Sequence, residues 1–208
     1  AMKPLKKVIL PFLLVPIVLG IVADLGMSIM VTLTFMVFML NIVFAITEKS
    51  NFHKLYGTLP VKQSASILSR YLFSLIAIGI TAILSFVIFI ILSIITSGRI
   101  DWIYGIQFLA LSILIAVLFI SIQYPFYFKF EYTKASIMAI LPYIVCFAIG
   151  IPLLNYFMNN QNFYQHIISV VNYFNSNILV FLLMIFVLSF LAITGSYLLS
   201  KKVQKKEF

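Results

Sequence analysis

The sequence predicts an all-α integral membrane protein of six transmembrane helices with both termini in the cytoplasm. Of its 208 residues, 63% are hydrophobic and only 9% are charged, with a mean hydropathy of +1.17. A soluble domain typically carries about a quarter charged residues. The apolar residues form runs close to the length of about 20 residues that crosses a bilayer as a helix. The basic residues fall almost entirely in alternate connections between these runs.

Six apolar runs are separated by turn residues or polar segments. We predict the spans Val8–Ala23, Leu25–Ile46, Tyr71–Thr96, Tyr104–Tyr124, Ala135–Phe157 and Ile178–Ser200. The first is short and contains two prolines, and the lysines before it also fit a secretory signal peptide. A tight turn at Asp24 leads directly into the second span without a cleavage pattern, which favours a hairpin. Ala1 stands ahead of Met2, which suggests either an added residue or a trimmed start, and in the second case the natural N-terminus is longer.

The basic residues predict the orientation, because cytoplasmic loops carry an excess of Lys and Arg. With the N-terminus inside, all but one of the 14 Lys and Arg residues are cytoplasmic. The exception is Arg99, next to Asp101 in a short outer loop that continues into two expected interface anchors, Trp102 and Tyr104. The net charge of +9 then reflects topology and attraction to anionic lipids. It does not indicate nucleic-acid binding, since no folded domain presents these residues.

The predicted spans lack the groups that ion-coupled transport or catalysis would need. Ion carriers and pumps require titratable groups at membrane depth. All five acids lie at span ends or in loops: Asp24, Glu48, Asp101, Glu131 and Glu207. The two histidines are predicted on opposite faces, Cys146 is alone, and neither an H-E-x-x-H nor a G-x-x-x-x-G-K-[ST] motif occurs. We therefore expect no enzyme activity, no cofactor and no metal in this chain.

The first cytoplasmic loop, residues 47–70, is the longest polar stretch. Within it Phe52, Leu55 and Tyr56 share one face of a short predicted helix. Gly57 can end that helix, and Leu59-Pro60 forces an extended or turned backbone. One interpretation is an amphipathic helix on the inner leaflet. The other is a transmission element that docks into a groove of a soluble partner.

Two loops carry a resemblance to a known family. Glu48–Leu72, "EKSNFHKLYGTLPVKQSASILSRYL", resembles the "E-K…L-P-V-[KR]…[KR]-Y-L" stretch of ABC-2 type transporter permeases, the membrane subunits of bacterial ATP-driven exporters. Tyr124–Ala135, "YPFYFKFEYTKA", is similar to that family's "P-[LF]-Y-[YF]-K-F-G-x-x-K-A". Glu131 departs from this pattern, which has a small residue there, usually glycine. The resemblance covers nearly the whole chain.

The resemblance implies a single transmembrane domain over residues 1–208, of the type V exporter-like class, in a bacterial cell membrane. It implies two permease copies, identical or not, each with a separate ATPase subunit that binds ATP and Mg. The coupling helix would lie in the first loop, with these site residues: Glu48, Lys49, Phe52, His53, Leu55, Tyr56, Gly57, Leu59 and Pro60. The second cytoplasmic loop, residues 125–134, would contribute Phe128, Lys129, Glu131 and Lys134.

Residues 158–177 form the other long stretch between spans, and their spacing predicts an amphipathic helix. We expect an interfacial or re-entrant helix on the outer side, with Phe163, Tyr164, Ile167 and Phe174 on its apolar side. The resemblance implies that it caps the exit route. The alternative is a helix that only lies on the outer leaflet.

The cargo is expected to be an amphipathic or hydrophobic peptide or a lipid-like molecule, because the spans are apolar and the chain has 21 Phe residues. Among small six-span permeases, the chain looks most similar to exporters of phenol-soluble modulins and to lantibiotic self-protection systems. The rival hypothesis is an ATPase-independent membrane scaffold or sensor whose basic loops hold anionic lipids.

Overall fold

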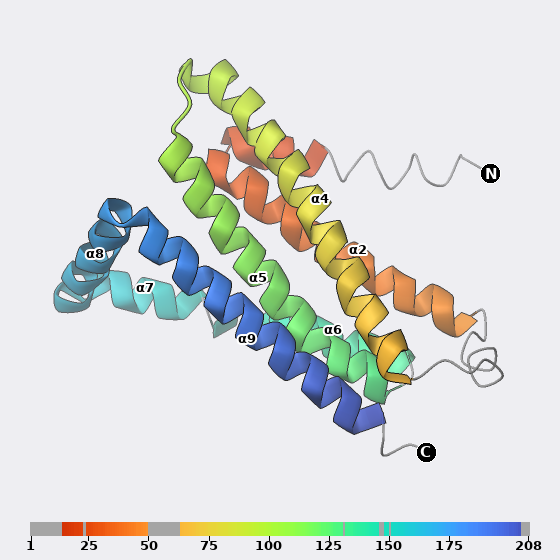
Figure 1. The fold of residues 1–208 in the computed structure, drawn as a ribbon. Helices are drawn as coiled ribbons and strands as arrows, with labels where there is room; N and C mark the ends of the chain where they lie inside the picture. The colour runs from red at the N-terminus through yellow and green to blue at the C-terminus, as the bar shows by residue number, and fades with distance from the viewer. Residues whose placement is uncertain are drawn as a thin grey trace. The chain divides into compact units, whose positions relative to one another are not determined.

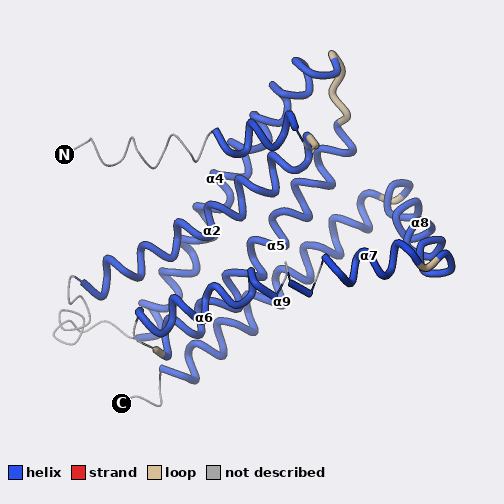
Figure 2. Tube along the Cα trace, turned by 180° about the vertical axis from the view of Figure 1, so that it is seen from behind, coloured by secondary structure: helices blue, strands red, loops and turns tan. Residues whose placement is uncertain are grey.

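The computed structural model describes residues 14–22, 24–49, 63–130, 132–145, 148–149 and 151–204, and these contain helices but no strand (Figures 1 and 2). Besides a helical segment at 14–22, the helices are α2 (Leu25–Lys49), α4 (Gln63–Ser97), α5 (Trp102–Lys129), α6 (Tyr132–Val145), α7 (Ile151–Asn159), α8 (Gln161–Ser176) and α9 (Ile178–Gln204). The chain divides into two compact units, Ala1–Ile120 and Ser121–Phe208, with the boundary inside α5.

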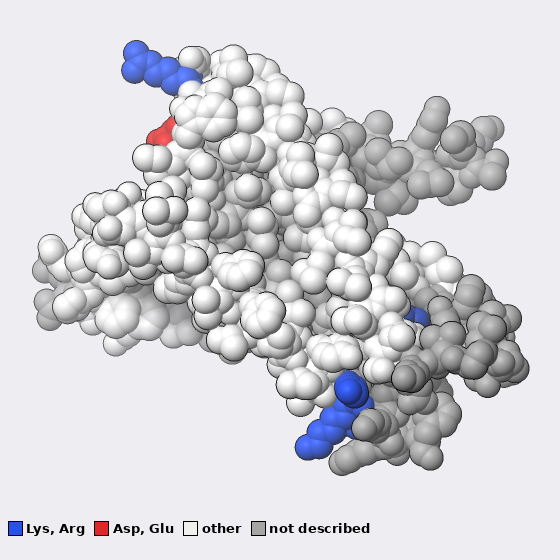
Figure 3. Space-filling model, viewed as in Figure 1, with Lys and Arg blue, Asp and Glu red and all other residues white. Residues whose placement is uncertain are grey.

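Four helices are long and apolar enough to cross a membrane. The candidate spans are Leu25–Phe44, Ser64–Ser97, Trp102–Lys129 and Ile178–Val203. They coincide with the second, third, fourth and sixth predicted spans, so the all-helical membrane class is confirmed. On the face displayed in Figure 3, the long middle stretches of the helices carry no charged side chain among the residues described. The total of six spans and the cytoplasmic location of the termini stay predictions.

The described residues of the fifth predicted span, Ala135–Phe157, are helical, and the two between α6 and α7, 148–149, are π-helical. α6 ends at Val145 and α7 begins at Ile151. Pro152 lies in the first turn of α7, where the missing N–H of proline costs no intrahelical hydrogen bond. A second proline, Pro142, lies inside α6. α6 continues past Pro142 to Val145, so this proline lies within the helix and does not end it.

In the first unit, α2 and α4 run side by side and form the main helix pair (Figure 1). Their buried residues recur every three or four positions, which is the spacing of interdigitating side chains along a helix–helix seam. On α2 they include Ile29, Leu33, Val37, Leu40 and Phe44, and on α4 Ile67, Tyr71, Ser74, Ile78, Thr81, Ser85, Phe89 and Leu92. The seam therefore runs along most of both helices.

The hydroxyl groups in this seam are hydrogen-bonded within their own helices. Thr32 Oγ1 donates to the carbonyl of Ser28 at 2.6 Å, and Thr81 Oγ1 donates to Ala77 at 2.7 Å. Ser and Thr are small, and their hydroxyl groups can donate a hydrogen bond to the backbone carbonyl four residues earlier. They therefore let helices approach closely without leaving a buried donor unpaired.

Close packing also joins α2 to α5 near the start of both helices. A Cβ atom added at Gly26 would lie only 2.5 Å from the ring of Phe108. The Phe108 ring in turn packs against Tyr104, with 4.5 Å between the ring centroids. Glycine fits position 26 because a Cβ atom there would force the Phe108 ring to shift or the two helices to separate.

In the second unit, a hydroxyl group on α9 satisfies a carbonyl that a proline leaves unpaired. Pro125 lies inside α5 and has no N–H to donate to the carbonyl of Ser121, four residues earlier. Ser196 Oγ donates to that carbonyl at 2.7 Å. Ser196 is only 4% exposed, so water has little access to its side chain. This hydrogen bond joins α5 to α9 at the position where the backbone of α5 is interrupted.

A similar contact joins α5 to α6 beside Pro142. Gln123, which is fully buried, donates through Nε2 to the carbonyl of Ala139 at 3.1 Å. Ala139 lies three residues before Pro142, in the turn that the proline ring distorts. The side-chain amide of α5 therefore supplies a donor to the weakened turn of α6.

We predict that Ser196→Ala destabilises the protein by about 1–2 kcal/mol, because the carbonyl of Ser121 loses its donor at a buried site. Thermal unfolding in a mild detergent measures the change. The matched control is Ser189→Ala on the same helix, whose buried hydroxyl has no partner in the described part of the chain. In a Pro125→Ala background, where residue 125 regains its N–H, Ser196→Ala should cost less. Equal losses in both backgrounds would contradict this explanation.

Candidate functional site

Most of the predicted coupling residues lie outside the described residues. These are Phe52, His53, Leu55, Tyr56, Gly57, Leu59 and Pro60. Glu48 and Lys49 are the last two residues of α2, and α4 begins at Gln63. The structure therefore describes the two helix ends that flank the predicted coupling loop, the end of α2 and the beginning of α4, and we call these two ends the frame of the loop.

The beginning of α4 extends the helix well beyond the length needed to cross a bilayer. α4 has 35 residues, and at about 1.5 Å per residue it is about 52 Å long, against about 30 Å for the hydrocarbon core. The predicted span starts at Tyr71, so residues 63–70 continue the same helix toward the loop. A displacement of the loop would therefore act directly on a continuous helix.

Arg70 and Phe44 join the two sides of this frame. The guanidinium carbon of Arg70 on α4 lies 4.7 Å from the ring centroid of Phe44 on α2, within cation–π distance. Phe44 is 6% exposed, and Ile67 and Tyr71 on α4 are also buried. The two ends that hold the loop are thus packed against each other.

The second predicted loop is short and belongs to the other unit. α5 ends at Lys129, where the Nζ atom lies 5.0 Å from the ring centroid of Phe130. Phe128 packs edge-on against the buried Tyr124, with centroids 6.4 Å apart. Lys134 is exposed in the first turn of α6. The predicted site residue Glu131 lies outside the described residues.

The predicted exit-side residues fall on α8. Phe163 stacks on Phe157 of α7 at 4.4 Å, and Phe174 packs against Phe181 of α9 at 5.5 Å. Tyr164 is exposed and Ile167 is half-buried. Two of the four residues therefore attach α8 to its neighbours, which sequence spacing alone did not indicate. The location of α8 at a membrane surface stays a prediction.

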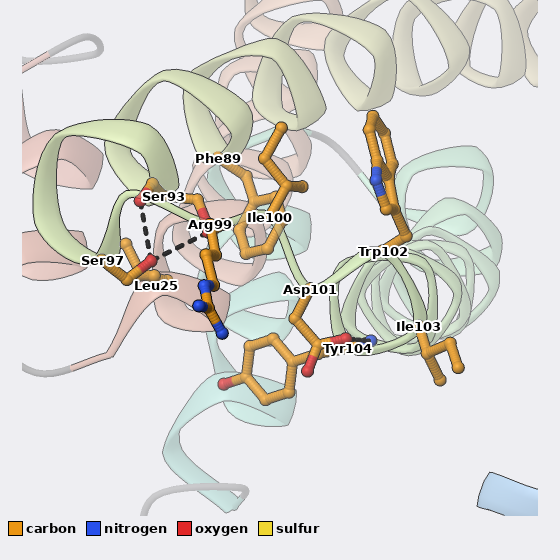
Figure 4. Close-up of a pocket in the computed structure, with 10 residues that line it drawn as sticks. All are labelled: Leu25, Phe89, Ser93, Ser97, Arg99, Ile100, Asp101, Trp102, Ile103 and Tyr104. Carbon is orange, nitrogen blue, oxygen red and sulfur yellow. Dashed lines mark hydrogen bonds between the residues drawn. The ribbon is translucent and has the colours of Figure 1, made fainter.

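A pocket in the first unit was not predicted. It has a volume of about 550 Å³ and lies where α4 ends and α5 begins (Figure 4). Its lining residues are Leu25, Phe89, Ser93, Ser97, Arg99, Ile100, Asp101, Trp102, Ile103 and Tyr104. The feature of the sequence that could have indicated this pocket is Arg99, the single basic residue on the predicted outer side, which is close in sequence to Trp102 and Tyr104. Among the residues described, no group of three or more His, Cys, Asp or Glu side chains could hold a metal ion.

The long apolar helices place the chain in the class of multi-pass membrane proteins. A family model described as "ABC-2 family transporter protein" matches residues 1–205. The chain therefore belongs to the ABC-2 transporter family, a family of membrane transport components. No curated protein and no solved structure matches the chain significantly.

We predict a coupling free energy of about 0.5–2 kcal/mol between Phe44 and Arg70, the range for cation–π pairs. A double-mutant cycle of Phe44→Leu and Arg70→Met measures it through unfolding in detergent. Leucine keeps an apolar side chain and methionine keeps a long one, so the cycle isolates the contact between the ring and the cation. Repeating it with Phe38→Leu, at an exposed position of the same helix, should give no coupling. Additive effects of Phe44→Leu and Arg70→Met would contradict the contact.

Proposed function

We propose that this chain is the permease subunit of an ATP-driven exporter and is powered by a separate ATPase subunit that binds ATP and Mg. The observation that carries the proposal is the family match over residues 1–205. The 208 residues contain no P-loop motif, so ATP hydrolysis by that route would use residues other than these. Two permease subunits, identical or homologous, form the pathway between them.

The coupling step uses the loop between α2 and α4. Nucleotide binding closes the ATPase subunits and displaces the short helix that carries Phe52, Leu55 and Tyr56, whose side chains fill a groove on the ATPase. Glu48 and Lys49 anchor this helix to α2, while Gly57 and Pro60 fix its angle. The contact between Arg70 and Phe44 supports the proposal, because it makes both ends of the loop move as one.

The interdigitated seam between α2 and α4 then carries the displacement through the membrane. Packed side chains of this kind resist sliding, because a shift along the axis would force them out of their gaps. The pair therefore tilts as a body between inward-open and closed states. The second loop, at Phe128, Lys129 and Lys134, gives the other unit its own contact with the ATPase.

The cargo is an amphipathic or hydrophobic peptide or a lipid-like molecule. The four long helices expose many Ile, Leu, Val and Phe side chains and almost no charged ones within their candidate spans. A pathway between two such subunits has apolar walls, which suit a cargo that buries apolar surface. α8 lies across the exit and is released when the pathway opens.

Purification from the native membrane tests the class of function. We expect a soluble ATPase in a one-to-one ratio with the chain, identified by mass spectrometry after extraction in mild detergent. A chain that emerges alone, or only with lipids, would support the rival hypothesis of a scaffold or sensor. Binding to anionic vesicles that salt abolishes would favour that rival further.

We predict that Phe52→Ala combined with Tyr56→Ala weakens ATPase binding and cargo-stimulated ATP hydrolysis by at least about tenfold, because each large apolar side chain contributes 1.5–3 kcal/mol when fully buried. The matched control is Phe186→Ala combined with Tyr156→Ala, a Phe and a Tyr that are 68% and 66% exposed. The control should keep both activities. Full cargo-stimulated hydrolysis in the first variant would exclude the coupling role of this loop.

A further inference from the structure

We propose that the pocket between the end of α4 and the beginning of α5 binds the headgroup of a zwitterionic aminophospholipid such as phosphatidylethanolamine, with the phosphate at Arg99 and the ammonium at Asp101. Both side chains are exposed and line the pocket. The proposal concerns lipid binding and is independent of ATP-driven export.

The backbone around Arg99 is held in place by hydrogen bonds. α4 ends at Ser97, and Gly98 turns the chain with a φ of 65°, in the left-handed region that favours glycine. Ser93 Oγ and Ser97 Oγ both donate to the carbonyl of Arg99, at 2.7 Å and 2.9 Å. The loop is therefore fixed at the mouth of the pocket by the last turns of α4 (Figure 4).

The two opposite charges at the mouth do not pair with each other. The guanidinium of Arg99 has no hydrogen bond or ion pair with any described residue. Asp101 Oδ1 accepts the backbone N–H of Tyr104 at 3.1 Å, which caps the beginning of α5. The nearby acid Asp24 is occupied by the hydroxyl of Tyr104. A cation and an anion are thus presented separately, on the same side of the loop as Tyr104 in Figure 4.

Below this polar mouth the pocket is apolar. Leu25 of α2, Phe89 of α4 and Ile100 of the loop contribute to its wall, and Trp102 projects to the opposite side of the loop from Arg99 (Figure 4). Trp and Tyr residues at the ends of spans lie at the level of lipid headgroups. At that depth an aminophospholipid presents an ammonium, a phosphate and then an acyl chain, and these groups match Asp101, Arg99 and the apolar wall of the pocket.

The charges at the mouth favour a zwitterionic lipid headgroup as the occupant. Arg99 and Asp101 offer one cation and one anion, which match a phosphate and an ammonium. The pocket has a volume of about 550 Å³. A headgroup with the first part of an acyl chain fits this volume and leaves the remaining chain in the bilayer. Arg99 binds phosphate through charge-assisted hydrogen bonds, which are stronger than neutral ones.

Trp102 is the only tryptophan in the chain and is one of the residues that line the pocket, so its fluorescence can be used to detect a brominated acyl chain beside it. The experiment uses the full chain in an uncharged detergent and titrates it with phosphatidylethanolamine or phosphatidylglycerol carrying brominated acyl chains, which quench tryptophan on contact. We expect saturable quenching with a preference for phosphatidylethanolamine. Equal quenching by both lipids, without saturation, would overturn the proposal.

Three variants separate the contributions. Arg99→Gln should weaken binding of both lipids about tenfold, because it removes the charged donor to the phosphate. Asp101→Asn keeps a residue that caps helices well but should abolish the preference for phosphatidylethanolamine. Lys202→Gln, which removes an equally exposed positive charge from α9, should change neither. Unchanged binding in Arg99→Gln, or an unchanged preference in Asp101→Asn, would contradict the assignment.

Two competitors identify the source of the ligand. Glycerophosphoethanolamine has the same headgroup without acyl chains and should not reverse the quenching at equal concentration. Full reversal would show a site for a free phosphate ester and overturn the lipid proposal. The second competitor is an anionic amphipathic peptide. If it quenched Trp102 or displaced the brominated lipid in a saturable way, and the two lipids had bound equally well, the lipid proposal would be wrong and the pocket would be a contact for cargo.

Discussion

Backbone carbonyls at membrane depth need donors from the protein, because no water is available there. The two units meet this requirement differently. α2 and α4 contain no proline, so no backbone hydrogen bond of these helices lacks its donor for that reason. Hydroxyls in their seam, such as those of Thr32 and Thr81, donate within the same helix. The second unit contains Pro125 and Pro142. Ser196 of α9 supplies the donor that Pro125 lacks, and Gln123 of α5 donates to the carbonyl of Ala139, three residues before Pro142.

This difference has mechanical consequences for a transporter. An uninterrupted helix pair with interdigitated side chains moves as a body and transmits a displacement along its length. A helix with a proline bends at that position, and the compensating hydrogen bond holds the bend against one neighbour. In the proposed exporter, the first unit therefore carries the motion, while the second unit changes shape at defined points. The proline in the second loop motif, Pro125, acquires a structural role through its partner on α9.

The sequence was sufficient to predict what hydrophobicity alone determines. The four long helices and the helical class follow from apolar run length, because lipid leaves few alternatives to a helix. The fifth span stays a prediction, because its middle falls partly outside the described residues. The contact between Phe44 and Arg70 was beyond prediction, since it depends on how two helices align. Of the predicted coupling residues, only Glu48 and Lys49 at the end of α2 fall among the described residues, so the roles of the set stay predictions.

Basic residues serve two different purposes on the two predicted sides of this membrane protein. On the predicted cytoplasmic side, lysines are spread over loops and termini, where a summed field attracts anionic lipids without selecting among them. On the predicted outer side there is one basic residue, Arg99, whose carbonyl accepts hydrogen bonds from Ser93 and Ser97 of α4. A lone charge contributes little to a field, but a lone charge on an ordered loop that also carries an opposite charge, Asp101, can recognise a zwitterionic molecule. If Arg99 served only to anchor a span end, neither the ordered loop nor its separation from Asp101 would be needed.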